Sequence, residues 1–260
     1  MNAWTVTALA ELTSAERQVA DLLPIEADPT EAEAVLDEVP FWFHTFALNR
    51  ANGIYAPGYA RDHRYRVPAI PESFDGLSVL DIGSFDGFYA FLAESRGAER
   101  VVAVDNEQYI DWVRARWAIE LEGGEGFRAI HRLIGSGVEY SKLDALDLDR
   151  LGESYDFIFC CGILHRVEAP ARLLEVLSRH LSERGAVLIE THGVFEAPQD
   201  GAPVHRYGPG EVYPRDDYVY WGFTAGGIEM LGRKSGFRRF ELIDAPVIDG
   251  HPRIIGWLRR

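Results

Sequence analysis

Apolar and polar positions alternate in blocks along most of the chain, and these blocks predict an α/β fold. Short apolar runs predict strands at about 77–82, 100–105, 138–143, 155–161 and 186–191. Between them, amphipathic stretches predict helices near 87–96, 108–122 and 169–183. Because strands alternate with helices, we expect a mostly parallel sheet with right-handed crossovers and helices on both faces.

The two ends of the chain depart from this alternation. Residues 1–50 are expected to be helical, since Thr13 and Glu16 have the spacing of a capping box and Asp28-Pro29 that of a helix start. At the other end, residues 237–260 predict two strands joined by a turn at 249–252, hence an antiparallel pair. The expected fold is therefore a Rossmann-like, seven-stranded, mostly parallel sheet with an antiparallel last strand and an N-terminal helical extension.

The length of 260 residues suits one large domain with additions. We expect an extension at 1–70, acting as a lid or an oligomer surface, and a domain at 71–260. Residues 194–223 interrupt the alternation with Pro, Gly and aromatic residues, and we expect them to cover a substrate. The cluster RDHRYR at 61–66 is mixed in charge, which is typical of a solvated face.

The most informative stretch is VLDIGSFDGFYAF at 79–91, an apolar strand that ends in Asp81 and continues through a glycine loop into a helix. A second strand ends in Asp105, whose carboxylate would accept ribose hydroxyls at the same sheet edge. The loop lacks the G-x-G-x-x-G pattern of dinucleotide sites, and Asp86 would repel a pyrophosphate at the helix start. This favours S-adenosylmethionine over NAD or FAD; the alternative is a glycine turn without a ligand.

The composition of the chain indicates which kinds of ligand and which cellular location suit it. The net charge is −15 with only two lysines, so nucleic acid is a poor partner and a small or cationic substrate is favoured. Cys160 and Cys161 are adjacent and form no disulfide framework, which fits a cytoplasmic location. No apolar run has the length of a membrane span, and the first residues lack the features of a signal peptide. The bias to arginine and alanine suggests a bacterial genome.

Four motifs carry a resemblance that covers roughly residues 70–260: VLDIGSFDG, VVAVDNE, YDFIFCCGILHRVEAP and ERGAVLIET. The chain resembles class I S-adenosylmethionine-dependent methyltransferases. Within that superfamily it is most similar to the tRNA wobble-uridine (5-oxyacetate) alkyltransferases and their small-molecule relatives, through GA-x-x-VVAVD, G-I-L-H-R-x-x-x-P and LIET. The wobble-uridine group has a tyrosine where this chain has His165. That difference and the negative charge favour ordinary methyl transfer to a small molecule.

The resemblance also implies which residues hold the cofactor. Its methionine part would lie by Asp81, Gly83, Ser84 and Gly87, with Cys161 and Gly162 along the methionine side. Its adenosine part would be held by Asp105 at the ribose, by Asn106 beside the adenine, and by Asp144 and Ala145 on the adenine's flanks.

Methyl transfer to a hydroxyl needs collinear positioning and a base that takes the proton. His165 and His192 follow the fourth and fifth strands and are candidate bases, unless they only tie loops to backbone carbonyls. Glu190 would orient a histidine, bind a substrate hydroxyl or tie down a loop. His44 is a candidate lid residue or a core histidine among aromatic neighbours. Aromatic walls for the substrate are expected from Tyr218, Tyr220 and Trp221, although these rings would equally form a second small core.

These observations predict an S-adenosylmethionine-dependent methyltransferase for a small metabolite, acting on oxygen in the biosynthesis of natural products. The alternatives are alkyl transfer to a tRNA wobble uridine and a non-catalytic cofactor-binding protein. The eight histidines show no paired metal spacing and Asp216-Asp217 reads as a solvated turn, so no metal is expected. The aromatic N-terminal segment is a candidate homodimer surface.

Overall fold

A parallel sheet with one antiparallel strand organises the computed structural model, which describes residues 11–194 and 204–260. In these residues seven strands follow the order β10-β12-β7-β6-β3-β4-β5, and β11 pairs beside β12. Strands β7, β6, β3, β4 and β5 are parallel, whereas β12 runs antiparallel to both β7 and β10. The strands are β3 (Ser78–Ile82), β4 (Arg100–Asp105), β5 (Glu139–Lys142), β6 (Tyr155–Cys161), β7 (Leu181–His192), β10 (Arg239–Asp244), β11 (Val247–Ile248) and β12 (His251–Arg259). The expected sheet is confirmed.

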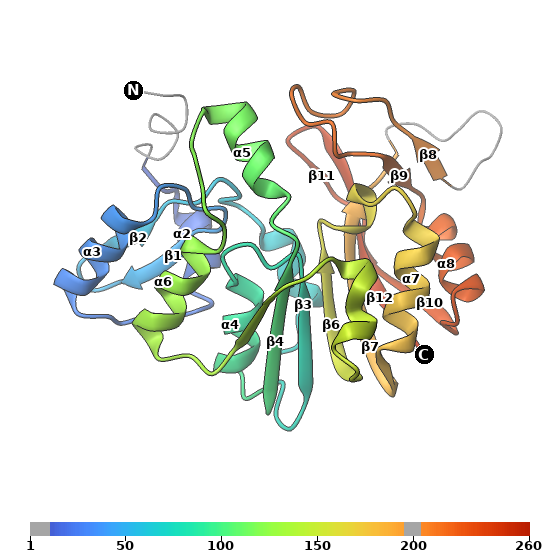
Figure 1. Ribbon diagram of the computed structural model, residues 1–260, viewed down its shortest axis with the longest axis horizontal. Helices are drawn as coiled ribbons and strands as arrows, with labels where there is room; N and C mark the ends of the chain where they lie inside the picture. The colour runs from blue at the N-terminus through green and yellow to red at the C-terminus, as the bar shows by residue number, and fades with distance from the viewer. Residues whose placement is uncertain (1–10, 195–203) are drawn as a thin grey trace.

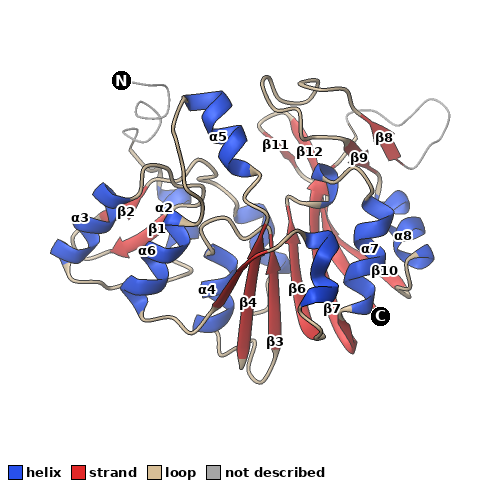
Figure 2. Cartoon of the chain, viewed as in Figure 1, coloured by secondary structure: helices blue, strands red, loops and turns tan. Residues whose placement is uncertain are grey.

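Helices cover both faces of this sheet (Figure 2). The first face packs on α4 (Phe88–Ser95), α5 (Tyr109–Trp117) and α6 (Glu125–Ile134). The second packs on the 3₁₀ turn η2 (Ala145–Arg150), on α7 (Pro170–Arg179) and on α8 (Ala225–Lys234). Neighbouring strand residues point to opposite faces, so Phe157 enters the first core and Ile158 the second.

The N-terminal residues form helices and a hairpin against the first face. The capping box of α2 (Ser14–Ala20) is present, and Asp28 caps α3 (Pro29–Glu38). The expectation of helix up to residue 50 was wrong, because β1 (Phe46–Asn49) and β2 (Ile54–Ala56) pair as an antiparallel hairpin. Every residue of β1 is buried, and a fully buried run with an aromatic residue is typical of a strand.

Two further segments differ from the sequence expectation. The helix expected at 108–122 ends at Trp117, because Ala118 adopts a left-handed φ of 55°, and α6 follows after two glycines with positive φ. The cluster at 61–66 is a solvated face only in part, since Asp62 and Arg64 are exposed. It leads into the 3₁₀ helix η1 (Arg64–Ala69), and both His63 and Arg66 are buried. A repeat of three residues per turn places these two side chains on the same side.

The carboxyl ends of the parallel strands lie together at the upper edge in Figure 1. There α5 rises on one side, and the β11–β12 hairpin with β8 (Val204–Arg206) and β9 (Trp221–Phe223) lies on the other (Figure 1). Part of the expected insertion, residues 195–203, falls outside the described residues. The described remainder contains a small core of Tyr207, Val212 and Val219. No helix in 11–194 or 204–260 has the length and apolar character to cross a membrane.

Candidate active site at the carboxyl edge of the sheet

The loop between β3 and α4 has the geometry expected of a cofactor loop. Gly83 and Gly87 have φ of 68° and 82°, a backbone region that glycine adopts without strain. The amide N–H of Gly83 donates to the carbonyl of Val104 at 2.8 Å, which ties the loop to the end of β4. A Cβ on Gly87 would lie 2.6 Å from the Phe127 ring and 2.7 Å from the Phe91 ring. The loop therefore fits closely between two strands and two helices.

Two buried polar atoms, one at the end of β3 and one in this loop, have no hydrogen-bond partner among the described residues, and they mark where a ligand would bind. They are Asp81 Oδ2 and Ser84 Oγ. Burial, followed by the nearby charge of Asp105, raises the pKa of Asp81 well above its usual range. A bound ammonium group would relieve this, so the residues present fit the amino-acid end of S-adenosylmethionine.

Asp105 ends β4 beside this loop and is 6% exposed. Its carboxylate accepts hydrogen bonds from the amides of Phe85 at 2.8 Å and Glu107 at 2.6 Å. Burial raises its pKa to about 6, although these two bonds act in the opposite direction. Each carboxylate oxygen has further acceptor capacity, so ribose hydroxyls remain possible partners.

The expected adenine residues come together at the ends of β4 and β5. The Asn106 side chain donates to Asp144 Oδ2 at 2.8 Å, and Asp144 Oδ1 accepts from the Leu146 amide. Asp144 thereby caps η2, which begins at Ala145. Asn106 is exposed and Asp144 and Ala145 are half-buried, so these groups border solvent, as a binding edge requires.

The end of β6 lies against the same loop. A Cβ on Gly83 would overlap Ile163, and a Cβ on Gly162 would lie 3.7 Å from a guanidinium nitrogen of Arg66. Cys161 and Gly162 are half-buried. Burial raises the pKa of the Cys161 thiol, so this thiol is protonated at neutral pH and is not a nucleophile.

A buried charged cluster that the sequence analysis did not identify adjoins these residues. Glu190 accepts from Arg66 at 2.7 Å and from Arg253 at 2.6 Å, and it is fully buried. Arg66 also donates to the Tyr89 hydroxyl at 3.0 Å, and that hydroxyl lies 2.7 Å from His63 Nδ1. Burial opposes ionisation of Glu190, but the two guanidinium groups outweigh it and lower its pKa. One sequence signal pointed here: Arg253 shares a strand face with the buried Ile255.

The two candidate bases differ in their hydrogen bonds. His165 Nδ1 accepts from the His192 amide at 3.3 Å and lies 3.2 Å from the Thr191 hydroxyl, so the proton of the neutral ring is at Nε2. His192 Nδ1 instead donates to the Gly193 carbonyl at 2.7 Å, which leaves Nε2 as the basic nitrogen. Burial lowers the pKa of His192 to about 4, and burial with the charges of Arg253 and Arg166 lowers that of His165. Both imidazoles are therefore neutral at pH 7.

The candidate substrate residues do not form one group. Tyr220 lies next to His165, since its amide donates to the His165 carbonyl at 2.9 Å. Trp221 donates to the Glu168 carbonyl, and Tyr218 is half-buried and donates its amide to Asp216. His44 lies instead on the cofactor loop, where it contacts Asp86.

Among the described residues, His192 is surrounded instead by rings from the insertion and from β12, and not by the three aromatic residues expected to line the substrate. The His192 ring centroid lies 5.8 Å from those of Tyr207 and Tyr213 and 5.7 Å from that of His251. Asp216 is not part of a solvated turn as expected, because it is 3% exposed and paired with Arg166 at 3.0 Å.

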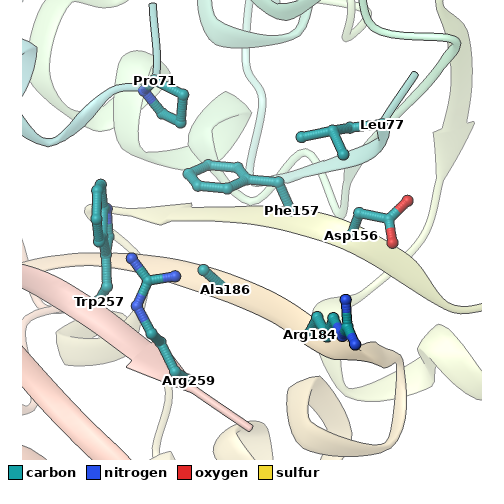
Figure 3. Close-up of a pocket in the computed structure, with 8 residues that line it drawn as sticks. All are labelled: Pro71, Leu77, Asp156, Phe157, Arg184, Ala186, Trp257 and Arg259. Carbon is teal, nitrogen blue, oxygen red and sulfur yellow. The ribbon is translucent and has the colours of Figure 1, made fainter. Parts of the chain in front are cut away.

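A hollow of 410 Å³ lies away from this site, at the opposite edge of the sheet (Figure 3). It is lined at the strand starts by Leu77, Asp156 and Phe157, and across from them by Trp257 and Arg259 (Figure 3). Since β12 runs antiparallel, its end meets the starts of its neighbours. Over the part of the chain that the structure describes, no three His, Cys, Asp or Glu side chains are grouped to hold a metal ion.

Comparison with known proteins supports the assignment of the fold. A family model described as "Methyltransferase domain" matches residues 80–189. The N-terminal domain of EvdMO1 with S-adenosylhomocysteine bound has a TM-score of 0.65 at 18% identity, covering 90% of this chain and 97% of that one. An S-adenosylmethionine-dependent methyltransferase from Mesorhizobium loti has a TM-score of 0.54 at 19% identity, covering 76% and 96%.

Curated sequences similar to this chain include the tRNA U34 carboxymethyltransferases. The protein of that name from Campylobacter hominis is 26% identical over 174 residues, which are 67% of this chain and 55% of the relative. The chain spans about half the length of the curated relatives that it matches. Residues 80–189 therefore match a methyltransferase domain, and the chain shares the fold of the S-adenosylmethionine-dependent methyltransferases named above.

Proposed function

We propose that the chain methylates an oxygen atom of a small metabolite, with His192 as the general base. The observation that carries this proposal is the state of His192: a buried, neutral imidazole with its proton on Nδ1 and its basic nitrogen among aromatic rings. A base must be unprotonated at the working pH, and this imidazole meets that condition.

When bound, S-adenosylmethionine would supply an electrophilic methyl group on a sulfonium. Asp81, Ser84 and Gly83 would hold its amino-acid end, Asp105 its ribose, and Asn106, Asp144 and Ala145 its adenine, while Gly87 starts the helix behind it. Cys161 and Gly162 would line the methionine side.

The chain's own groups would then position the acceptor. His192 Nε2 would take the hydroxyl proton as the methyl group is transferred, and the Tyr207 and Tyr213 rings would exclude water from it. Glu190 acts through Arg66 and Arg253, because both of its oxygens are bonded to guanidinium groups. His165 would support β7 beside the base rather than share its task.

Two observations favour a small acceptor over tRNA. The net charge of −15 opposes binding to a polyanion. One neighbour of the same fold, from Burkholderia thailandensis, is a 1,6-didemethyltoxoflavin-N1-methyltransferase, with a TM-score of 0.50 at 19% identity. We place the activity in the cytoplasm and in the secondary metabolism of a bacterium. The curated relatives favour the second candidate, alkyl transfer to a tRNA wobble uridine.

The test is mass spectrometry of small molecules and of bulk tRNA, each incubated with the protein and methyl-deuterated S-adenosylmethionine. We expect the label in a small molecule and not in tRNA nucleosides. The His192→Gln variant should lose this product yet bind S-adenosylhomocysteine as the wild type does. Label in a wobble nucleoside would replace the proposal with the tRNA function, and cofactor binding without any labelled product would favour a non-catalytic protein.

A further inference from the structure

Asp86 connects the cofactor loop to the N-terminal part of the chain. Its Oδ2 accepts from the amides of Phe43 and His44, each at 2.8 Å, and its Oδ1 accepts from His44 Nδ1 at 2.5 Å. Three hydrogen bonds from two consecutive residues thus end on one carboxylate, and the Asp86 side chain is 1% exposed. Asp86 therefore faces the N-terminal segment and not the space where a cofactor phosphate would lie.

The neighbouring loop residue, Phe85, is held by the same segment. Its φ is 53°, a conformation that is strained for a bulky side chain and persists only where the surroundings enforce it. Its ring stacks between Phe43, with centroids 4.7 Å apart, and Tyr109, with centroids 3.8 Å apart. The amide of Phe85 donates to Asp105 Oδ2, so the strained residue directly orients Asp105, the residue expected to bind the ribose.

The segment that holds the loop is itself fixed on its other side. The amides of Tyr59 and Ala60 donate to the carbonyls of Trp42 and Phe43 at 2.9 and 2.7 Å. Gly58 approaches so closely that a Cβ there would lie 2.2 Å from the carbonyl carbon of His44. Because the segment at 42–44 is bonded on both sides, it cannot shift without also moving the loop at 85–86.

We propose that His44 and Asp86 are a positioning pair through which residues 41–46 hold the loop 83–87 in its cofactor-binding shape. The N-terminal segment is then a structural part of the cofactor site rather than a lid over it. This inference rests on the assigned cofactor and not on the identity of the acceptor. His44 is a positioning residue, since it acts through Asp86, and nothing in its contacts places it on the substrate.

The test compares three variants of the full chain by calorimetry with S-adenosylhomocysteine and by urea unfolding. His44→Leu removes the ring donor and should raise the Kd at least tenfold. His44→Asn places an amide N–H where Nδ1 stands and should restore most of the affinity. Asn49→Ala is the matched control: Asn49 is 7% exposed and bonds Ala27 and Asn52 within the N-terminal unit, away from the loop. It should reduce stability but leave the Kd within twofold of wild type.

Asp86→Asn is a fourth variant, in case His44→Leu does not fold. It keeps an oxygen for the two amides but loses the charged partner of His44, and a Kd between those of wild type and His44→Leu is expected. An unchanged Kd in a folded His44→Leu protein overturns the proposal. So does an equal rise of the Kd in Asn49→Ala and His44→Leu at equal loss of stability. If the wild type itself fails to bind S-adenosylhomocysteine, the cofactor assignment fails, which is a different outcome.

Discussion

At the scale of single residues, buried carboxylates near the carboxyl ends of the strands differ in whether they have hydrogen-bond or ion-pair partners. A buried charge is costly unless it is paired and hydrogen-bonded, and Asp86, Glu190 and Asp216 all have such partners. Asp81 differs, since its Oδ2 has no hydrogen-bond partner among the described residues. We interpret this asymmetry as a sign of function: a buried carboxylate oxygen without a partner lies where a cationic ligand is expected.

Glu190→Gln should be strongly destabilising. The change removes the one negative charge that both guanidinium groups contact, and breaking a buried ion pair costs about 3–5 kcal/mol. Urea unfolding of wild type and variant measures the loss. The control is Glu241→Gln, whose carboxylate pairs with Arg259 at the surface and should cost less than about 1 kcal/mol. Equal losses of stability in the two variants would contradict the view that Glu190, Arg66 and Arg253 form an ion-pair cluster shielded from water.

The low pKa of His192 predicts a stability that falls with acid. Since its folded pKa of about 4 lies below the ordinary 6.5, the unfolded chain binds more protons in this interval, and stability rises with pH between these values. From pH 7 to pH 5 this group should cost about 2 kcal/mol.

Asp105 opposes that trend, because its raised pKa of about 6 favours the folded state as pH falls through that value. The informative quantity is thus the difference between wild type and His192→Gln in urea unfolding at the two pH values. The variant should lose less stability on acidification, by the amount given above. Identical pH dependence in both proteins would mean that His192 is not buried in its neutral form.

At the scale of elements, the loop between β3 and α4 combines three constraints. It needs left-handed backbone at Gly83 and Gly87, contact with Val104 on the next strand, and the N-terminal segment against Asp86. The first two are local to a strand–loop–helix unit. The third comes from residues 43 and 42 positions away in sequence.

Gly87→Ala should therefore cost more than the same change at another glycine of similar backbone. Gly76 has φ of 70° with nothing within 4 Å of a Cβ, so Gly76→Ala should cost about 1 kcal/mol for backbone strain alone. Gly87→Ala adds overlap with the Phe91 and Phe127 rings and should cost about 3 kcal/mol. Urea unfolding gives both values. S-adenosylhomocysteine binding should weaken for Gly87→Ala alone. Equal losses of stability and affinity in the two variants would show that the loop is not tightly packed at Gly87.

The same distinction explains how far the sequence predicted the fold and the site. Strands β4 and β6 have the predicted bounds, and the caps Thr13 and Asp28 are present, because apolar runs and caps are local signals. Helix α6 was not predicted because two glycines precede it. Strand β1 was not predicted because the aromatic residues around it show no clear periodicity.

The residues of the candidate site also divide into those with a local sequence signal and those without one. The strand tips Asp81 and Asp105 follow from alternation and a loop pattern. Arg66 and Arg253 meet Glu190 from segments 124 and 63 residues away, and no local pattern records such a contact. The tie between His44 and Asp86 was hidden for the same reason, although each residue had been singled out.

At the scale of the whole molecule, negative charge dominates and much of the positive charge is already paired. The chain has 41 acidic and 26 basic residues. Exposed or half-exposed arginines form ion pairs with carboxylates, among them Arg50 with Glu26, Arg100 with Glu139, Arg114 with Glu120, Arg132 with Glu38 and Arg179 with Asp149. A guanidinium paired with a carboxylate presents little net positive charge to a phosphate backbone, so these residues add little to binding of nucleic acid.

The protein should therefore not bind bulk tRNA, even at low salt. A protein that neutralises several phosphates gains affinity steeply as salt is reduced, by about 10³-fold or more between 200 and 50 mM for six contacts. We expect filter retention of labelled tRNA to stay at background over this range, with and without S-adenosylhomocysteine. The affinity for S-adenosylhomocysteine, a small ligand held in a buried site, should meanwhile change little with salt. Retention of tRNA that falls linearly with the logarithm of salt concentration would reveal a basic surface despite the overall charge, and the wobble-uridine function would then become the better proposal.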